Sequence, residues 1–287
     1  MLSSLATVLF DGFAYGMLLF LLSVGLSVTL GMMNFVNLAH CSFAAVGGYC
    51  TVTLVNSFGW PFLASLPIAF IAAALVSVVL ERTLYRHLYR SSDLDQCLLT
   101  IGIVFVSVAA FAWFYTTEQQ SARPPEWLRA RITVGGINFA GYRLFLIVFG
   151  LAVTAILVLL LERTRFGAQV RAAVDNQRMA RGLGIDVDRA FMITFALGGG
   201  LAGLGGALAI EVVGLDPTFA LAFLVYVLIV VAVGGLGSIG GSFAAAVVLG
   251  ISDMAGKYYF PWLGAFLIYL VMVGLLMWRP LGLFGKR

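Results

Sequence analysis

The sequence predicts an all-α membrane protein in which a bundle of apolar helices crosses the bilayer several times. Of its 287 residues, 62% are hydrophobic and only 10% are charged, and the mean hydropathy is +1.04. A soluble domain of this composition would lack the polar residues needed to cover its core. Several apolar runs also approach the roughly 20 residues that a membrane-spanning helix requires. We therefore expect a single transmembrane domain over residues 1–287.

The apolar runs divide the chain into about nine hydrophobic segments. They cover residues 10–30, 36–56, 62–80, 97–115, 144–161, 190–210, 217–234, 240–254 and 262–278. Segments 217–234 and 240–254 are short and interrupted by glycine, so one or both are candidates for a re-entrant path. The sequence leaves eight or nine crossings open.

Clusters of basic residues predict which connections face the cytoplasm. The clusters comprise Arg82, Arg86 and Arg90; Arg163, Arg165, Arg171, Arg178, Arg181 and Arg189; and Arg279, Lys286 and Arg287. With nine crossings all three clusters fall on one side, which the positive-inside rule assigns to the cytoplasm. The N-terminus is then outside and the C-terminus inside. This topology accounts for the net charge of +4, and no nucleic-acid partner is expected.

The second hydrophobic segment is the most polar of the set. Asn34, Asn37 and His40 recur every three residues, and Ser42 and Tyr49 follow them. Polar groups at membrane depth must find partners or water. Two interpretations therefore stay open: these side chains either bind neighbouring helices, or they line a translocation pathway or position a broken helix beside it.

Two connections outside the spans carry distinct patterns. Arg82, Arg86 and Arg90 follow the third segment at a spacing of four, so one helical face would be basic and could meet anionic lipid or a protein partner. The loop 116–143 contains alternating runs on either side of Gly135-Gly136, which predicts a hairpin. This external loop is either a landing platform for a soluble binding protein or a cap on the bundle.

The loop 162–189 is a charged island between two apolar segments. Residues 168–181 contain strong helix formers and no proline, and Arg171, Asp175 and Arg178 have the spacing of one helical face. Gly182 and Gly184 would end this helix, and Asp186 or Asp188 would cap the next. An ordinary basic cytoplasmic loop would show much of the same composition.

Several motifs along the chain resemble one family. They are Thr164-Arg165-Phe166-Gly167, Arg171-Ala172, Gly184-Ile185, Phe195, the glycine runs at 201–206 and 234–242, and the ending Arg279-Pro280 to Gly285. Together these resemble the permease subunits of branched-chain amino acid ABC importers over nearly the whole chain. In place of the Glu-Ala-Ala loop common in ABC permeases, this chain has Arg171-Ala172-Ala173.

The resemblance implies half of a membrane channel in the bacterial inner membrane. Its implied partners are a second related permease, two cytoplasmic ATP-binding subunits and an extracytoplasmic solute-binding protein. ATP and Mg²⁺ would be bound by the ATPase subunits, and this chain would hold no cofactor and no metal. The coupling surface would comprise Arg165, Gly167, Arg171, Asp175, Arg178, Arg181 and Gly184. The implied cargo is leucine, isoleucine and valine, while urea, amides and aromatic acids remain alternatives.

Two other functions fit the residues less well. An intramembrane enzyme would use His40 with Ser42, Ser238 or Ser242, but the sequence contains no Gly-x-Ser-x-Gly motif, no His-Glu-x-x-His motif and no paired intramembrane aspartates. An autonomous channel or ion-coupled carrier usually needs carboxylates at membrane depth. Glu211, Asp216 and Asp253 all lie near predicted segment ends, where we expect them to reach water.

Overall fold

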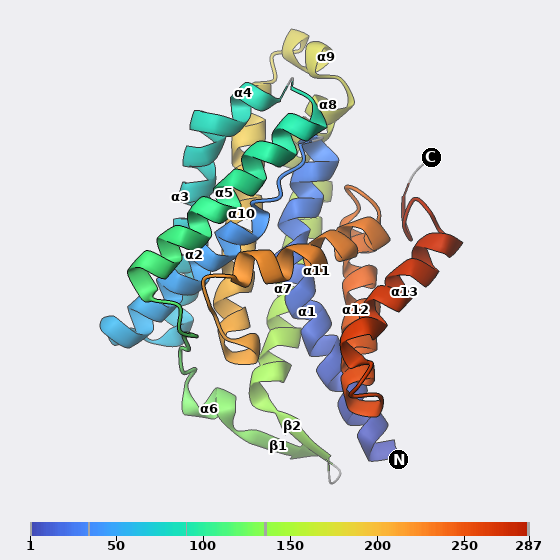
Figure 1. Ribbon diagram of the computed structural model, residues 1–287. Coiled ribbons are helices and arrows are strands. Elements are labelled where there is room, and N and C mark those ends of the chain that lie inside the picture. The colour runs from blue at the N-terminus through green and yellow to red at the C-terminus, as the bar shows by residue number, and fades with distance from the viewer. Residues whose placement is uncertain (1, 34, 90, 135–136, 286–287) are drawn as a thin grey trace.

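The computed structural model describes residues 2–33, 35–89, 91–134 and 137–285. It is a bundle of helices with one small hairpin, so the predicted all-α membrane architecture is confirmed (Figure 1). The long helices are α1 (Leu2–Met33), α3 (Phe62–Leu80), α5 (Asp93–Tyr115), α7 (Gly141–Arg163), α10 (Val187–Val213) and α12 (Ile239–Tyr259). Shorter ones are α2 (His40–Val52), α4 (Arg86–Leu88), α6 (Glu126–Arg129), α8 (Arg165–Asp175), α9 (Gln177–Gly182), α11 (Phe219–Gly234) and α13 (Gly264–Trp278). Two π-helical turns, η1 (Thr53–Ser57) and η2 (Glu81–Tyr85), extend α2 and α3.

Six helices of the described chain are long and apolar enough to cross a membrane, and α11 and Phe266–Trp278 are shorter apolar helices. Within the most hydropathic parts of α1 and α10, 89% and 78% of residues are buried, against 11% in α5. Helices α1 and α10 therefore form the centre of the bundle, and α5 lies at its edge. Segment 240–254 belongs to a continuous helix of 21 residues, whereas α11 has only 16.

Polar connections gather at the two ends of the bundle. The N-terminus lies at the same end as α6 and the hairpin, and α4, α8 and α9 lie at the opposite end (Figure 1). Near the C-terminus, Leu283 and Phe284 donate backbone hydrogen bonds to Val233 and Gly234 at 2.7 and 3.2 Å, beside the turn between α11 and α12. That turn contacts Gly31 near the end of α1. The predicted separation of the polar connections into two ends agrees with this arrangement.

Glycines bring the central helices into backbone contact. A Cβ atom placed on Gly206 of α10 would overlap the carbonyl of Ala44 in α2, and one on Gly47 would overlap Gly203. On the other side of the core, Gly16 of α1 packs against Gly250 of α12. Small residues allow this approach where no hydrophobic driving force exists between helices in lipid. Glycine therefore allows the α2–α10 and α1–α12 pairs to pack backbone against backbone.

Residues 35–39, just before α2, are not helical and run through the interior of the bundle. Their backbone groups find partners on α5 and nearby: Val36 N–H donates to Gln96 Oε1 at 3.0 Å, and Leu38 N–H donates to Thr100 Oγ1 at 3.2 Å. Asn37 and His40 therefore do not share a helical face, because α2 begins only at His40. The three-residue spacing of Asn37 and His40 in the sequence therefore does not correspond to one helical face in the structure.

The predicted hairpin is confirmed in the loop 116–143. Strands β1 (Arg131–Val134) and β2 (Ile137–Ala140) pair antiparallel, with Arg131 opposite Ala140 and Val134 opposite Ile137. Gly135 and Gly136, on which the prediction was centred, lie outside the described residues. The hairpin stays close to the start of α1, since Phe139 and Phe10 form an edge-to-face pair with centroids 4.6 Å apart.

The glycine contacts lead to a stability prediction. Gly206→Ala should destabilise the protein by about 1–3 kcal/mol, because the added methyl group must displace the backbone of α2. The matched control is Gly102→Ala on α5, where an added Cβ meets no atom within 4 Å. Thermal unfolding of the purified chain in detergent measures both. Equal melting temperatures for the two variants would contradict the proposed contact.

Candidate functional site

The predicted coupling segment lies at one end of the bundle, as expected, but it is built from two helices (Figure 1). The single helix predicted over 168–181 is wrong, because the chain breaks at Asn176, whose φ and ψ are −155° and 96°. The Asn176 side chain accepts a hydrogen bond from the Met179 backbone at 3.0 Å and so caps α9. Asparagine competes with helical hydrogen bonding in this way. Arg171 and Asp175 therefore lie on α8, and Arg178 and Arg181 lie on α9.

Helix α8 is fixed to the bundle. Val170 and Ala173 are fully buried, and the Thr164 hydroxyl caps the helix by accepting from the Gly167 backbone at 3.3 Å. Gly167 packs on the backbone of Leu161 at the end of α7, where a Cβ would overlap the Leu161 carbonyl. The guanidinium of Arg171 donates to that same carbonyl. Arg171 thus ties α8 to α7, in addition to any role at the surface.

The far end of the segment is also anchored. Gly184 adopts a left-handed conformation with φ of +82° just after α9. Asp186 then caps α10 by accepting from the Arg189 backbone at 2.9 Å, which selects one of the two predicted caps. Asp188 instead forms an ion pair with Arg181 at 2.8 Å. A small buried cluster, made of Ala173, Ala180, Val187 and Phe191, joins α8, α9 and α10.

The outer surface of this segment is partly apolar. Arg165, Asp175, Arg178 and Arg181 are exposed, as a coupling role requires. Met179 and Leu183 are also exposed, at 67% and 80%, although they lie among charged residues at the polar end of the bundle. The sequence analysis missed both. The sequence did contain a signal for them. Met179 and Leu183 are apolar residues four positions apart in a stretch rich in arginine. We define Met179 and Leu183 as the apolar patch.

The second basic connection runs from the π-helical turn η2 into α4. Arg82 lies in η2 and Arg86 begins α4, and both side chains line one cavity. The Arg82 Nε atom lies 3.7 Å from Glu81 Oε2, and its Nη2 atom is 2.8 Å from the sulfur of Met192 in α10. Arg86 has no ion-pair partner among the described residues. Arg90 lies outside them.

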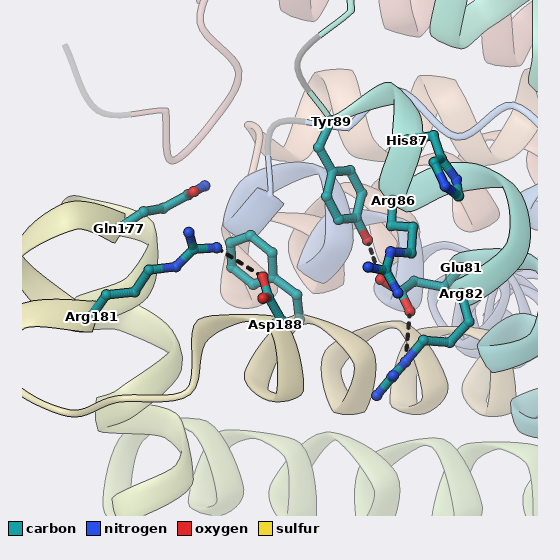
Figure 2. A pocket seen from close by; sticks show the side chains of 9 residues that line it. Glu81, Arg82, Arg86, His87, Tyr89, Gln177, Arg181 and Asp188 are labelled. Carbon is teal, nitrogen blue, oxygen red and sulfur yellow. Dashed lines mark hydrogen bonds and ion pairs between the residues drawn. The ribbon is translucent and has the colours of Figure 1, made fainter.

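A cavity of about 460 Å³ opens between the two basic connections (Figure 2). We call it the inner cavity. It is lined by Glu81, Arg82, Arg86, His87, Tyr89, Gln177, Arg181, Asp188 and Phe191. The Tyr89 hydroxyl donates to Glu81 Oε1 at 2.8 Å. Burial raises the pKa of Tyr89, and the hydrogen bond to Glu81 raises it further, so this hydroxyl keeps its proton. The sequence analysis did not predict this cavity. Its lining residues come from 81–89 and 177–191, and tertiary packing brings these two stretches together.

The candidate pathway residues lie inside the bundle, with Asn34 outside the described residues. His40 Nε2 donates to the Leu22 carbonyl of α1 at 3.1 Å, and Ser42 bonds Ser107 of α5 at 2.8 Å. Asn37 Oδ1 accepts from the Ala39 backbone at 3.1 Å. The Tyr49 ring is stacked on Tyr115 with centroids 4.3 Å apart. Each of these side chains thus has a packing partner, and the buried Asn37 Nδ2 and Tyr49 hydroxyl have no hydrogen-bond partner.

Asp253 does not reach water, contrary to expectation. It is fully buried, and its Oδ2 atom accepts from Lys257 at 2.6 Å. The reason is the length of α12, which continues to Tyr259 and so places Asp253 one and a half turns inside the helix. Its Oδ1 atom has no hydrogen-bond partner. Glu211 is exposed, as expected, and Asp216 is partly exposed and accepts from Thr218.

Comparison with known proteins gives consistent matches over nearly the whole chain. The family described as "Branched-chain amino acid transport system / permease component" matches residues 8–276. The probable branched-chain amino acid transport permease LivH of Methanocaldococcus jannaschii is 28% identical, covering 94% of this chain and 90% of its own length. The high-affinity branched-chain amino acid permease BraD of Pseudomonas aeruginosa is 24% identical, covering 97% and 95%.

A second type of relative also matches. The high-affinity branched-chain amino acid permease LivM of Escherichia coli is 26% identical and covers 93% of this chain and 68% of its own length. No solved structure matches the chain significantly. With a match over residues 8–276, the chain belongs to the family of permease components of branched-chain amino acid transport systems.

Proposed function

We propose that this chain is one permease subunit of an ATP-driven importer of branched-chain amino acids, and that separate ATPase subunits drive it through α8 and α9. The chain contains no phosphate-binding Gly-x-x-x-x-Gly-Lys-Ser/Thr motif, so ATP and Mg²⁺ would bind to those partners. In this role the chain is a transport subunit and not an enzyme. The names of its relatives favour branched-chain amino acids over urea, amides or aromatic acids as cargo.

The observation that carries this proposal is the apolar patch on α9. Met179 and Leu183 are exposed at the polar end of the molecule, within a segment whose other outward side chains are mostly charged. Apolar residues rimmed by arginines are typical of protein–protein interfaces. Docking of a partner would bury these two side chains and pair Arg178 with one of its acidic groups.

The packing of α8 explains how force on the patch would reach the membrane core. Helix α8 contacts α1, α7 and α10, and its buried residues share a cluster with α9 and α10. The central helices are in backbone contact through their glycines and resist separation. A push on α8 and α9 would therefore move this core as a body, which would open one end of the pathway and close the other.

The remaining partners follow from the same role. Escherichia coli has both a LivH and a LivM protein that match this chain, which supports a pair of related permeases in one importer. The hairpin of β1 and β2, at the end of the bundle opposite α8 and α9, would meet a solute-binding protein outside the cell. Arg82 and Arg86 face the cytoplasmic membrane surface in this orientation, where anionic lipid is available.

If an ATPase subunit docks at the apolar patch, charged side chains placed there should uncouple ATP hydrolysis from uptake. A Met179→Glu, Leu183→Glu variant should reduce binding-protein-stimulated uptake in proteoliposomes by about tenfold or more, because docking would bury two carboxylates in place of apolar side chains. The control is Met179→Leu, which keeps the surface apolar and should retain uptake. Membrane insertion of both variants should be normal. Full uptake by the doubly charged variant would refute docking at this patch.

Orientation can be tested by labelling single cysteines. In a background in which Cys41, Cys50 and Cys97 are replaced by alanine, we would introduce Leu183→Cys or Trp127→Cys, both at exposed positions. A membrane-impermeant maleimide added to cells with a permeabilised outer membrane should label Trp127→Cys at once. It should label Leu183→Cys only after the inner membrane is opened. The reverse pattern would place α8 and α9 outside and contradict the proposed topology.

A further inference from the structure

We propose that the inner cavity is a binding site for a free α-amino acid, with Arg86 receiving the carboxylate and Glu81 receiving the ammonium group. The cavity lies between η2–α4 and α9–α10, at the same end as the apolar patch (Figures 1 and 2). The choice of an apolar amino acid as ligand rests on the proposed function. The inference concerns a site distinct from the buried pathway candidates.

Glu81 supplies a buried acceptor that lacks a partner. The residue is only 4% exposed and lines the cavity. Its Oε1 atom accepts from Tyr89, but its Oε2 atom has no hydrogen-bond partner. The nearest guanidinium atom, Arg82 Nε, is 3.7 Å away, which is too long for a hydrogen bond. An unsatisfied buried carboxylate oxygen is costly, and an ammonium group in the cavity would satisfy it.

Arg86 supplies the complementary donor. The other two arginines of the cavity are engaged, since Arg82 contacts Glu81 and Met192, and Arg181 pairs with Asp188 at 2.8 Å. Arg86 has no ion-pair partner in the described part of the chain, and it lies beside Glu81 in Figure 2. Guanidinium groups bind carboxylates through two parallel hydrogen bonds. The cavity therefore places a guanidinium group that has no ion-pair partner in the described chain beside a buried carboxylate oxygen that accepts no hydrogen bond. These two groups match the two charges of an amino acid.

The rest of the cavity suits an apolar side chain. Phe191 is 4% exposed and lies edge-to-face with Tyr89, with ring centroids 6.1 Å apart. These two rings belong to the wall of the cavity. A volume of about 460 Å³ lies within the range of roughly 300–1,000 Å³ that is usual for small-molecule sites. Two aromatic rings beside Arg86 and the unsatisfied Glu81 oxygen would favour leucine over a ligand that carries only a carboxylate.

Because the cavity lies beside α9 and α10, a bound amino acid would regulate transport. One wall is formed by residues of η2 and α4, and the other by Gln177, Arg181 and Asp188 of α9 and α10 (Figure 2). Phe191 belongs to the small buried cluster that holds α8 and α9, and Tyr89 packs against that cluster. A bound amino acid would bridge the two walls and restrain the segment on which the ATPase acts. Cargo that accumulates inside would then slow its own import.

Direct binding to the full-length chain tests the site. The probe is tritiated L-leucine, with the chain in phosphatidylcholine nanodiscs and binding followed by scintillation proximity. Glu81→Gln and Arg86→Gln should each weaken binding by about tenfold or more, because each removes one charge-assisted contact. Arg189→Gln is the matched control, since Arg189 is exposed at the same end but does not line the cavity. It should bind leucine as the unmodified chain does.

Two truncated analogues identify the role of each charge. In the unmodified chain, 4-methylpentanoate and 3-methylbutylamine should compete at least tenfold more weakly than leucine, because each lacks one charged group. Arg86→Gln should lose its preference for leucine over the amine, and Glu81→Gln should lose its preference for leucine over the acid. Arg86 is exposed, so its variant decides the question even if the Glu81 variant fails to fold.

Three outcomes would overturn the site. One is the absence of saturable leucine binding, and another is unchanged binding in both variants. The third is occupancy of the cavity by phosphatidylglycerol, shown by photocrosslinking in mixed nanodiscs, with none by leucine, since this would assign the cavity to a lipid headgroup.

The assembled importer separates this inference from the proposed function. Uptake into proteoliposomes that contain no internal leucine tests the proposed function alone. Leucine placed on the ATPase side should lower the initial uptake rate of the unmodified complex several-fold and leave Arg86→Gln unaffected. Normal uptake with no inhibition by internal leucine would overturn only the regulatory site. Absence of uptake in every variant, despite leucine binding, would instead refute the proposed function.

Discussion

The architecture depends on the need of every backbone polar group in an apolar medium to find a partner inside the protein. Helices satisfy this need by themselves, but residues 35–39 are not helical and are surrounded by other helices. Gln96 and Thr100 of α5 supply the missing partners, and both side chains are almost fully buried. Helix α5 is otherwise a peripheral span, and these two side chains, together with Ser107 and Tyr115, connect it to the centre of the molecule.

The same constraint explains why glycine is concentrated where it is. Helices with satisfied backbones gain little from meeting one another in lipid unless their surfaces approach very closely. Glycines on α1, α2, α10 and α12 provide this approach, and the hydroxyl pair of Ser27 and Ser242, 2.5 Å apart, adds a polar contact between α1 and α12. The resulting core is rigid, and the polar segment of α8 and α9 is attached to it through the end of α7 and the start of α10.

Much of the fold could be predicted because its signals are local. Apolar runs identified the spans, two alternating runs around a glycine pair identified the hairpin, and an aspartate before an apolar run identified the cap of α10. The predicted coupling helix failed where one side chain changed the local geometry. Asn176 caps α9 and so divides the segment into two helices.

The candidate site was harder to predict, since its parts are distant in sequence. Arginines in the coupling segment could be named from charge alone, but Met179 and Leu183 were not noticed because exposure is a tertiary property. The inner cavity joins residues about a hundred positions apart, and no spacing rule connects Glu81 with Asp188. Asp253 was misplaced for a simpler reason, as the end of α12 lay beyond the apolar run that defined the segment.

The broken stretch before α2 also constrains the order in which the protein is made. Residues 35–39 leave the ribosome about sixty residues before Gln96 and Thr100, which are their hydrogen-bond partners. Until α5 has been synthesised, this stretch can be neither a finished part of the bundle nor stable in lipid. The nascent chain must therefore keep it at the interface, in water, or as a temporary helix continuous with α1. We therefore expect this stretch to reach its final place in the bundle only after α5 has been made.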